Sequence, residues 1–313
     1  MIPIDPTSGA ADTSPQVAPA RMDAFRADRV YLGADHARNE RRTWIVTAIC
    51  AATLAAQLIG GLAFKSMALT AAGLHMAAHV AVLLVAAFAY RVARQRKDDP
   101  RYAFGTGKIG FLAGFANAVV LAATAFLIAL ESIERLIEPA AVDYDSALPL
   151  AAAGLAVTIV CVWLLKPARA AHDGDADLNL SAAHLHLSAD ALVGVLTLAG
   201  LAAGRSFGWS WTDPAAGLVG AALVAQFAWS LLRRTGGVLL DMNPSPALVA
   251  EIRARLQAQG ERVVDLHLWR LGPGHHAAIV VLEAAQPQDV QAYRARLAGL
   301  AGLSHLTIEV RRA

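Results

Sequence analysis

The sequence is poor in charged residues and in cysteine. Lys, Arg, Asp and Glu make up 17% of its 313 residues, whereas a soluble domain carries about a quarter. The formal net charge is only +2, so a nucleic-acid partner is not expected. Two cysteines are too few for a disulfide framework or a CxxC metal motif. Both of them, Cys50 and Cys161, lie in apolar blocks, where we expect small buried side chains.

The sequence is instead rich in apolar residues, which make up 56% of the chain and are gathered in blocks. Six blocks have close to the ~20 residues that cross ~30 Å of hydrocarbon. They are Thr43–Phe64, Met67–Tyr90, Ile109–Leu130, Ala147–Leu165, Ala183–Ala203 and Pro214–Leu232. The third block continues as a helix to Ile137, where Pro139 stops it. We therefore predict an α-helical membrane protein with a six-helix transmembrane domain over residues 41–240.

The segments on either side of this domain differ in composition. Residues 1–40 have no apolar run that could form the core of a signal peptide, so we expect a disordered tail. Residues 246–313 have the pattern of a small soluble domain with the order α-β-β-α-β. The predicted elements are 247–259, 263–269, 277–283, 287–300 and 306–310. This order predicts a ferredoxin-like α+β fold, whose small core favours a homodimer.

Basic residues lie at one side of the predicted spans. They precede the first span, fill the second and fourth connections and follow the sixth span: Arg38, Arg41, Arg42, Arg91, Arg94, Arg96, Lys97, Arg101, Lys166, Arg169, Arg233 and Arg234. The odd connections carry little positive charge. By the positive-inside rule, both termini and the C-terminal domain are cytoplasmic. We expect the protein in a bacterial inner membrane.

Two pairs of ionisable residues lie inside predicted spans. His75 and His79 are four residues apart in the second span, and His186 and Asp190 are four apart in the fifth. Residues with this spacing share one helix face, about 5–6 Å apart. Ionisable groups are costly in lipid and by default indicate an ion pathway, although packing residues that happen to be polar are the alternative. Two such pairs on facing helices supply four ligands, the number that zinc prefers.

Two further histidines lie near the cytoplasmic end of this predicted site. His184 is two residues from His186 and points to another face, so it is either a ligand at the cytoplasmic entrance or a packing residue. His172 belongs to a connection that also holds Asp173, Asp175 and Asp177. That connection is either a solvated acidic loop or a weak metal-collecting loop.

At the paired ligands the sequence resembles the cation diffusion facilitator family. The matching motifs are Ser66 with Ala68 and Leu69, Tyr102-Ala103-Phe104-Gly105, Glu131 with Arg135 and Pro139, Asn179, and Trp211-Thr212-Asp213-Pro214. The resemblance covers about residues 43–310. It implies a homodimeric exporter that exchanges a divalent metal ion for protons by alternating access, with no other cofactor. It also implies a cytoplasmic domain that binds metal, for which His267, His305 and Glu309 are the candidates.

Two departures from the family pattern bear on the metal. His79 stands where the family commonly has Asp, and Ala72 replaces an Asp three residues before the first ligand. Three imidazoles and one carboxylate disfavour Mn²⁺ and Mg²⁺. The His-rich quartet, together with the runs Asp265–Trp269 and Gly272–His275, looks most like the cobalt and nickel branch, so we rank Co²⁺ and Ni²⁺ ahead of Zn²⁺ or Cd²⁺. The three histidines are the predicted proton carriers, because protons and metal compete for imidazole nitrogens.

Two readings from other classes compete with a transporter. An intramembrane metalloenzyme is consistent with His75 and His79, but a zinc protease requires an HExxH motif, which is absent, and a desaturase requires several more histidine boxes. A membrane metal sensor predicts bound metal without flux. We therefore expect a transporter and not an enzyme.

Overall fold

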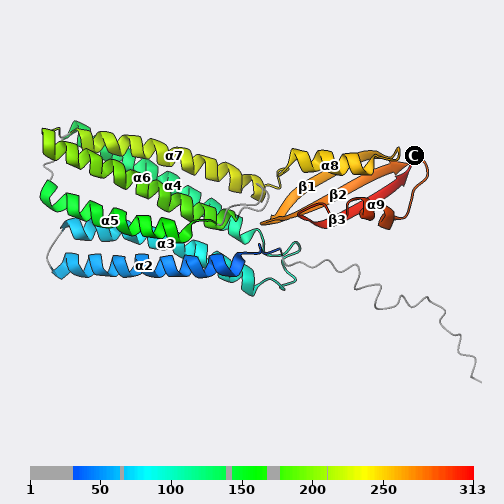
Figure 1. Ribbon diagram of the computed structural model, residues 1–313, viewed down its shortest axis with the longest axis horizontal. Helices are drawn as coiled ribbons and strands as arrows, with labels where there is room; N and C mark the ends of the chain where they lie inside the picture. Colours follow the sequence, from blue (N-terminus) through cyan, green and yellow to red (C-terminus); the bar gives the residue numbers. More distant parts are fainter. Residues whose placement is uncertain (1–30, 64–66, 139–142, 168–176, 210) are drawn as a thin grey trace, which may run out of the picture.

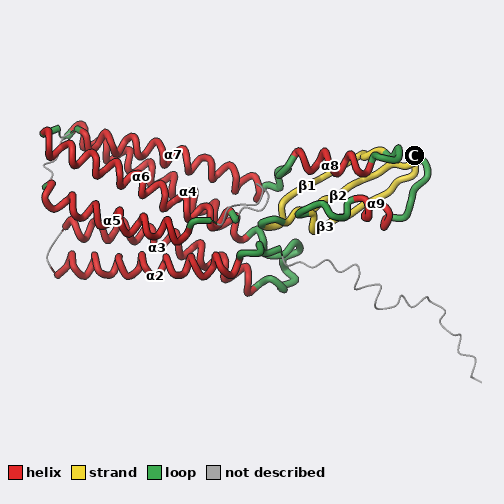
Figure 2. The backbone as a smooth tube through the Cα atoms, viewed as in Figure 1, coloured by secondary structure: helices red, strands yellow, loops and turns green. Residues whose placement is uncertain are grey.

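The computed structural model describes residues 31–63, 67–138, 143–167, 177–209 and 211–313. Within α2 and α3 it does not describe the side chains of residues 61, 67–72, 74 and 75. A bundle of long helices occupies one part of the molecule, and a small sheet with two short helices lies beyond one end of the bundle (Figures 1 and 2). The predicted tail lies outside the described residues up to residue 30.

Six helices in the described part of the chain are long and apolar enough to cross a membrane. They are α2 (His36–Ala63), α3 (Met67–Gln95), α4 (Ile109–Ile137), α5 (Tyr144–Leu165), α6 (Leu178–Phe207) and α7 (Thr212–Leu239). Large apolar side chains such as Ile59, Phe126 and Trp163 point outward with exposed fractions of 64–73%. Exposure on this scale requires an apolar surrounding, so the chain is an integral membrane protein.

Several helices extend beyond the apolar blocks from which the spans were predicted. The helix α2 begins at His36, seven residues before the predicted span, and α6 begins at Leu178, five residues before it. The start of α6 is fixed by Asp177, whose side chain accepts hydrogen bonds from the amides of Asn179 and Leu180. Polar residues therefore form the first turns of these two helices, whereas hydropathy alone detects only the apolar middle.

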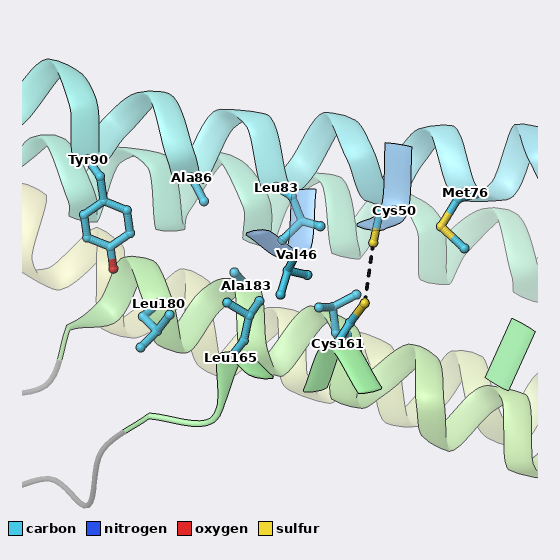
Figure 3. Close-up of a cluster of buried hydrophobic side chains, with 11 residues drawn as sticks. Val46, Cys50, Met76, Leu83, Ala86, Tyr90, Cys161, Leu165, Leu180 and Ala183 are labelled. Carbon is cyan, nitrogen blue, oxygen red and sulfur yellow. Dashed lines mark hydrogen bonds between the residues drawn. The ribbon is translucent and has the colours of Figure 1, made fainter. Parts of the chain in front are cut away.

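The core of the bundle forms where α2, α3, α5 and α6 meet (Figure 3). Cys50 and Cys161 lie in this core with exposed fractions of 2% and 0%, and their sulfur atoms are 3.8 Å apart. Both are free thiols. The prediction that they are small buried side chains is confirmed.

The C-terminal domain has the predicted element order. It contains α8 (Pro246–Leu256), β1 (Arg262–Gly272), β2 (His275–Ala284), α9 (Val290–Arg296) and β3 (Leu303–Arg312). The central strand β2 pairs antiparallel with β1 and parallel with β3, so β2, α9 and β3 form a crossover unit. α9 is shorter than predicted because the chain turns at Gly299, where φ is +81°. The prediction of a membrane bundle followed by a small α+β domain is confirmed.

The turn between β1 and β2 is packed against the membrane bundle. A Cβ atom at Gly272 would lie 2.1 Å from the Tyr31 carbonyl oxygen, and one at Gly107 would lie 2.4 Å from the Leu271 carbonyl oxygen. The ring of Phe104, in the connection between α3 and α4, stacks edge-on against Trp269. Glycine at positions 107 and 272 thus permits a close approach of backbones that joins the two parts of the molecule.

Candidate metal centre

The helices α3 and α6 bring three of the four predicted membrane ligands together. His79 on α3 meets His186 and Asp190 on α6, and their ligand atoms all lie within 4.8 Å of one another. The side chains are almost fully buried, with exposed fractions of 3%, 4% and 8%. Buried ionisable groups in a bundle are stable only when they are paired or hold an ion.

The three side chains converge on one carboxylate oxygen. Oδ2 of Asp190 lies 3.2 Å from Nδ1 of His79 and 3.4 Å from Nε2 of His186. The centroids of the two imidazole rings are 5.5 Å apart, and the ring planes are nearly perpendicular. With metal–ligand bonds of 2.0–2.2 Å, the edge of a tetrahedral site is about 3.3 Å long. The two N–O separations therefore match two edges of a tetrahedron around a zinc-sized ion.

The register between α3 and α6 is held by hydrogen bonds two helical turns away from the cluster. The Asn179 amide, which is buried, donates to the backbone carbonyl of Ala86 at 3.0 Å. Asn179 precedes His186 by seven residues, and Ala86 follows His79 by seven, so in antiparallel helices this bond places His79 beside His186. Asn179 is thus a positioning residue for the cluster.

A second link between the same helices lies nearer the end of the bundle that carries the C-terminal domain. The Tyr90 hydroxyl donates to Asp177 Oδ2 at 2.5 Å, and the Asn39 amide donates to the same oxygen at 2.9 Å. Figure 3 shows Tyr90 projecting from α3 toward the start of α6. Asp177, which the sequence placed in an acidic loop, therefore caps α6 and ties it to α2 and α3. An Asp just before an apolar helix is the signal that could have indicated this role.

Of the other three predicted histidines, the structure describes the side chain of His184 alone. The side chain of His75 lies outside the described residues, although its backbone is one turn before His79 in α3. The side chain of His184 is half-buried, lies near the backbone of Val162 on α5, and is not grouped with Asp190. His172 lies outside the described residues. The roles predicted for these three histidines stay predictions.

The candidate ligands of the C-terminal domain are spread over the sheet. His267 lies on β1 and His305 on β3, with the strand β2 between them. Two strand spacings place their backbones about 9.6 Å apart, and their side chains form no metal-binding group among the described residues. His267 instead pairs with Asp265 at 2.8 Å, and Glu309 pairs with Arg311 at 2.7 Å. Among the described residues, the structure does not bring His267, His305 and Glu309 together.

Together these features define a class: an integral membrane protein of six helices with a buried cluster able to bind a metal ion, joined to a small α+β domain. A family comparison identifies the chain further, since residues 43–240 match the model of the cation efflux transmembrane domain. This chain therefore belongs to the cation diffusion facilitator family. It is a transporter and not an enzyme, which removes the metalloenzyme reading.

Curated relatives share most of the length of the chain. The zinc transporter ZitB of Yersinia pestis is 29% identical over 288 residues, covering 87% of this chain and 88% of the relative. The metal cation efflux system protein CzcD of Cupriavidus metallidurans is 28% identical over 290 residues, covering 89% and 90%. A cadmium, cobalt and zinc/H⁺-K⁺ antiporter of Bacillus velezensis is 28% identical over 267 residues, covering 82% and 83%.

Proposed function

We propose that this protein exports Zn²⁺ across a bacterial inner membrane in exchange for protons. The transported ion would bind His75, His79, His186 and Asp190. The observation that carries this proposal is the convergence of His79, His186 and Asp190 on one buried point, with N–O separations that fit the edges of a tetrahedral site. His75 would supply the fourth ligand from the same face of α3.

The choice of zinc reverses the ranking made from the sequence. That ranking placed Co²⁺ and Ni²⁺ first because the His-rich quartet and two runs in the C-terminal domain resemble the cobalt and nickel branch. The relatives are instead named as transporters of zinc, or of cadmium, cobalt and zinc, which supports the alternative better. A site of three imidazoles and one carboxylate suits Zn²⁺ and accommodates Co²⁺. We therefore expect Zn²⁺ first, with Cd²⁺ and Co²⁺ as weaker substrates.

Proton exchange follows from the chemistry of the ligands. An imidazole must be neutral to bind a metal, so metal and protons compete for the same nitrogens of His79 and His186. The printed name of the Bacillus velezensis relative supports an antiport mechanism. In this proposal the imidazoles release metal as they take up protons, and Asp190 provides the fixed negative charge.

The orientation and the assembly of the protein are part of the same proposal. The basic residues gather at the bundle end that carries the sheet domain, which supports cytoplasmic termini. The C-terminal domain has a small core, and apolar side chains of its sheet such as Val264 and Ile279 remain exposed. Covering them with a second copy would stabilise the domain, so we propose a homodimer.

Transport assays in proteoliposomes test this proposal. Vesicles that contain the full-length protein are given a proton gradient, and uptake of Zn²⁺, Cd²⁺, Co²⁺, Ni²⁺ and Mn²⁺ is measured separately. We expect the highest kcat/KM for Zn²⁺ and none for Mn²⁺. The variant His186→Ala should lose transport, whereas His184→Ala, two residues away and outside the cluster, should retain it.

Three outcomes would contradict the proposal. Absence of flux for every ion would remove the export function. Faster transport of Co²⁺ or Ni²⁺ than of Zn²⁺ would restore the ranking made from the sequence. Equal activity in the His186→Ala and His184→Ala variants would show that the cluster is not the transport site.

A further inference from the structure

A groove of 420 Å³ lies where the membrane bundle meets the cytoplasmic domain. Its walls come from the start of α6, the end of α7, the link to α8 and the strand β1. Three guanidinium groups line it, those of Arg233 and Arg234 on α7 and of Arg270 on β1. Leu178, Val238 and Met242 add apolar surface. This volume is typical of sites that bind a small molecule or a part of a larger ligand.

Two carboxylates that neighbour groove residues in the sequence are engaged elsewhere. Asp177 accepts its hydrogen bonds from Tyr90 and from the first turn of α6, and Asp241 pairs with Lys108. In the part of the chain that the structure describes, Arg233 and Arg234 are exposed and neither pairs with a carboxylate. An anion beside Arg233 and Arg234 would therefore meet two positive charges that no described carboxylate offsets.

The third guanidinium comes from the other side of the junction. Arg270 belongs to β1 of the cytoplasmic domain and is only 8% exposed, with its guanidinium 6.0 Å from the ring of Phe111 on α4. An anion held between Arg270 and the arginines of α7 would thus contact both parts of the molecule. The anion would also reduce the electrostatic repulsion between Arg270 and the arginines of α7.

The neighbouring surface indicates that the groove opens to the edge of the bilayer. Trp229 lies one turn before Arg233 on α7, is 61% exposed, and holds the Arg233 guanidinium 5.5 Å above its ring. Exposed tryptophans on spanning helices concentrate at the level of the lipid headgroups. Basic pockets at this depth bind anionic headgroups, and apolar walls suit the adjoining glycerol and acyl carbons.

We propose that this groove binds one anionic phospholipid from the leaflet on the side of the cytoplasmic domain. The phosphate would interact with Arg233, Arg234 and Arg270, and the start of the acyl chains would lie along Val238 and Met242. A bound lipid would hold the cytoplasmic domain against the bundle. The groove's combination of arginines with apolar walls beside an exposed tryptophan favours a lipid over a soluble anion.

Lipid binding to the full-length protein in neutral detergent tests the proposal. Native mass spectrometry measures the affinity for cardiolipin and phosphatidylglycerol, with phosphatidylcholine as the neutral comparison. We expect at least tenfold tighter binding of the anionic lipids. Each arginine near a membrane surface contributes about fivefold in affinity, so the double variant Arg233→Gln/Arg234→Gln should bind them about 25-fold more weakly. The single variant Arg234→Gln should lose about fivefold.

A matched control separates this groove from general surface charge. The double variant Arg41→Gln/Arg91→Gln removes two exposed arginines from the same end of the bundle but outside the groove. It should keep anionic-lipid affinity within about twofold of the wild type. An equal loss in both double variants would overturn the proposal, as would equal affinity for neutral and anionic lipids.

Competition experiments test whether the groove binds the phosphate of a lipid or a soluble phosphate. Inorganic phosphate and glycerol 3-phosphate, at concentrations well above those of the lipid, should displace little cardiolipin because they lack acyl chains. If either binds as tightly as the lipid, the groove is a site for soluble anions and the lipid assignment is wrong.

Discussion

The membrane bundle and the cytoplasmic domain both carry histidines and carboxylates, but they place them differently. In the bundle, His79, His186 and Asp190 come from two helices and meet at one buried point. In the sheet domain, His267 and Glu309 lie near the surface and pair with neighbours on their own strands. This comparison indicates that histidines and carboxylates form a candidate metal site where separate helices bring them together in a buried position.

The largest expected effect is the loss of the carboxylate at the centre of the cluster. Asp190→Asn keeps the shape but removes the charge that contacts both imidazoles. Loss of residues that only support a ligand costs 10–100-fold in metal affinity, so loss of a ligand should cost at least about 100-fold. Isothermal titration with Zn²⁺ measures this. If the variant bound Zn²⁺ with wild-type affinity, the buried cluster of the bundle would not be the metal site.

A smaller effect is expected from loosening the register of the helices. Asn179→Leu removes the hydrogen bond to the Ala86 carbonyl, and we expect about tenfold weaker zinc binding by a protein that still folds. Asn117→Leu is the matched control, because Asn117 is also a buried amide in a span but lies on α4, outside the cluster. Equal losses in the two variants would mean that Asn179 contributes to packing alone.

The pH dependence of transport tests whether His79 in the buried cluster carries protons. Carboxyl groups take up protons about 2–3 pH units below imidazoles, so His79→Asp removes one competitor for protons near neutral pH. Zinc uptake by this variant should therefore persist to lower pH, and the pH of half-maximal uptake should fall by about one unit. An unchanged pH profile and proton stoichiometry would exclude His79 as a proton carrier.

The smallest effect is expected in the cytoplasmic domain. The double variant His267→Ala/His305→Ala removes one histidine from each outer strand, and neither residue belongs to the buried cluster. Zinc transport in proteoliposomes should stay within about twofold of the wild type. A loss of tenfold or more would show that this domain takes part in metal binding during transport.

The sequence predicted the spans well because hydrophobic length follows directly from the thickness of the bilayer. It also predicted that His186 and Asp190 share a helix face, since that depends on local spacing alone. It could not predict that His79 lies opposite Asp190, because the register depends on a bond from Asn179 to the backbone of Ala86. Every residue has a backbone carbonyl, so the residue type at position 86 does not indicate that this carbonyl accepts the bond.

The strand order explains why the cytoplasmic ligands were less predictable. His267 lies on the first strand in the sequence and His305 on the last. The sequence does not reveal that β2 lies between these two strands in the sheet. The groove between α7 and β1 was equally hidden. Arg234 and Arg270 are 36 residues apart in the chain, and only the docking of the sheet domain on the bundle brings them to one groove.

The central claim is that the transported ion is held in the bundle by imidazole and carboxylate groups. X-ray absorption at the zinc edge, on full-length protein loaded with one Zn²⁺ per chain, tests this most directly. We predict four nitrogen or oxygen ligands at about 2.0–2.1 Å and no sulfur, with a spectrum that changes in His186→Ala but not in His267→Ala/His305→Ala. A spectrum with sulfur ligands, or one that changes only in the cytoplasmic variant, would contradict the account.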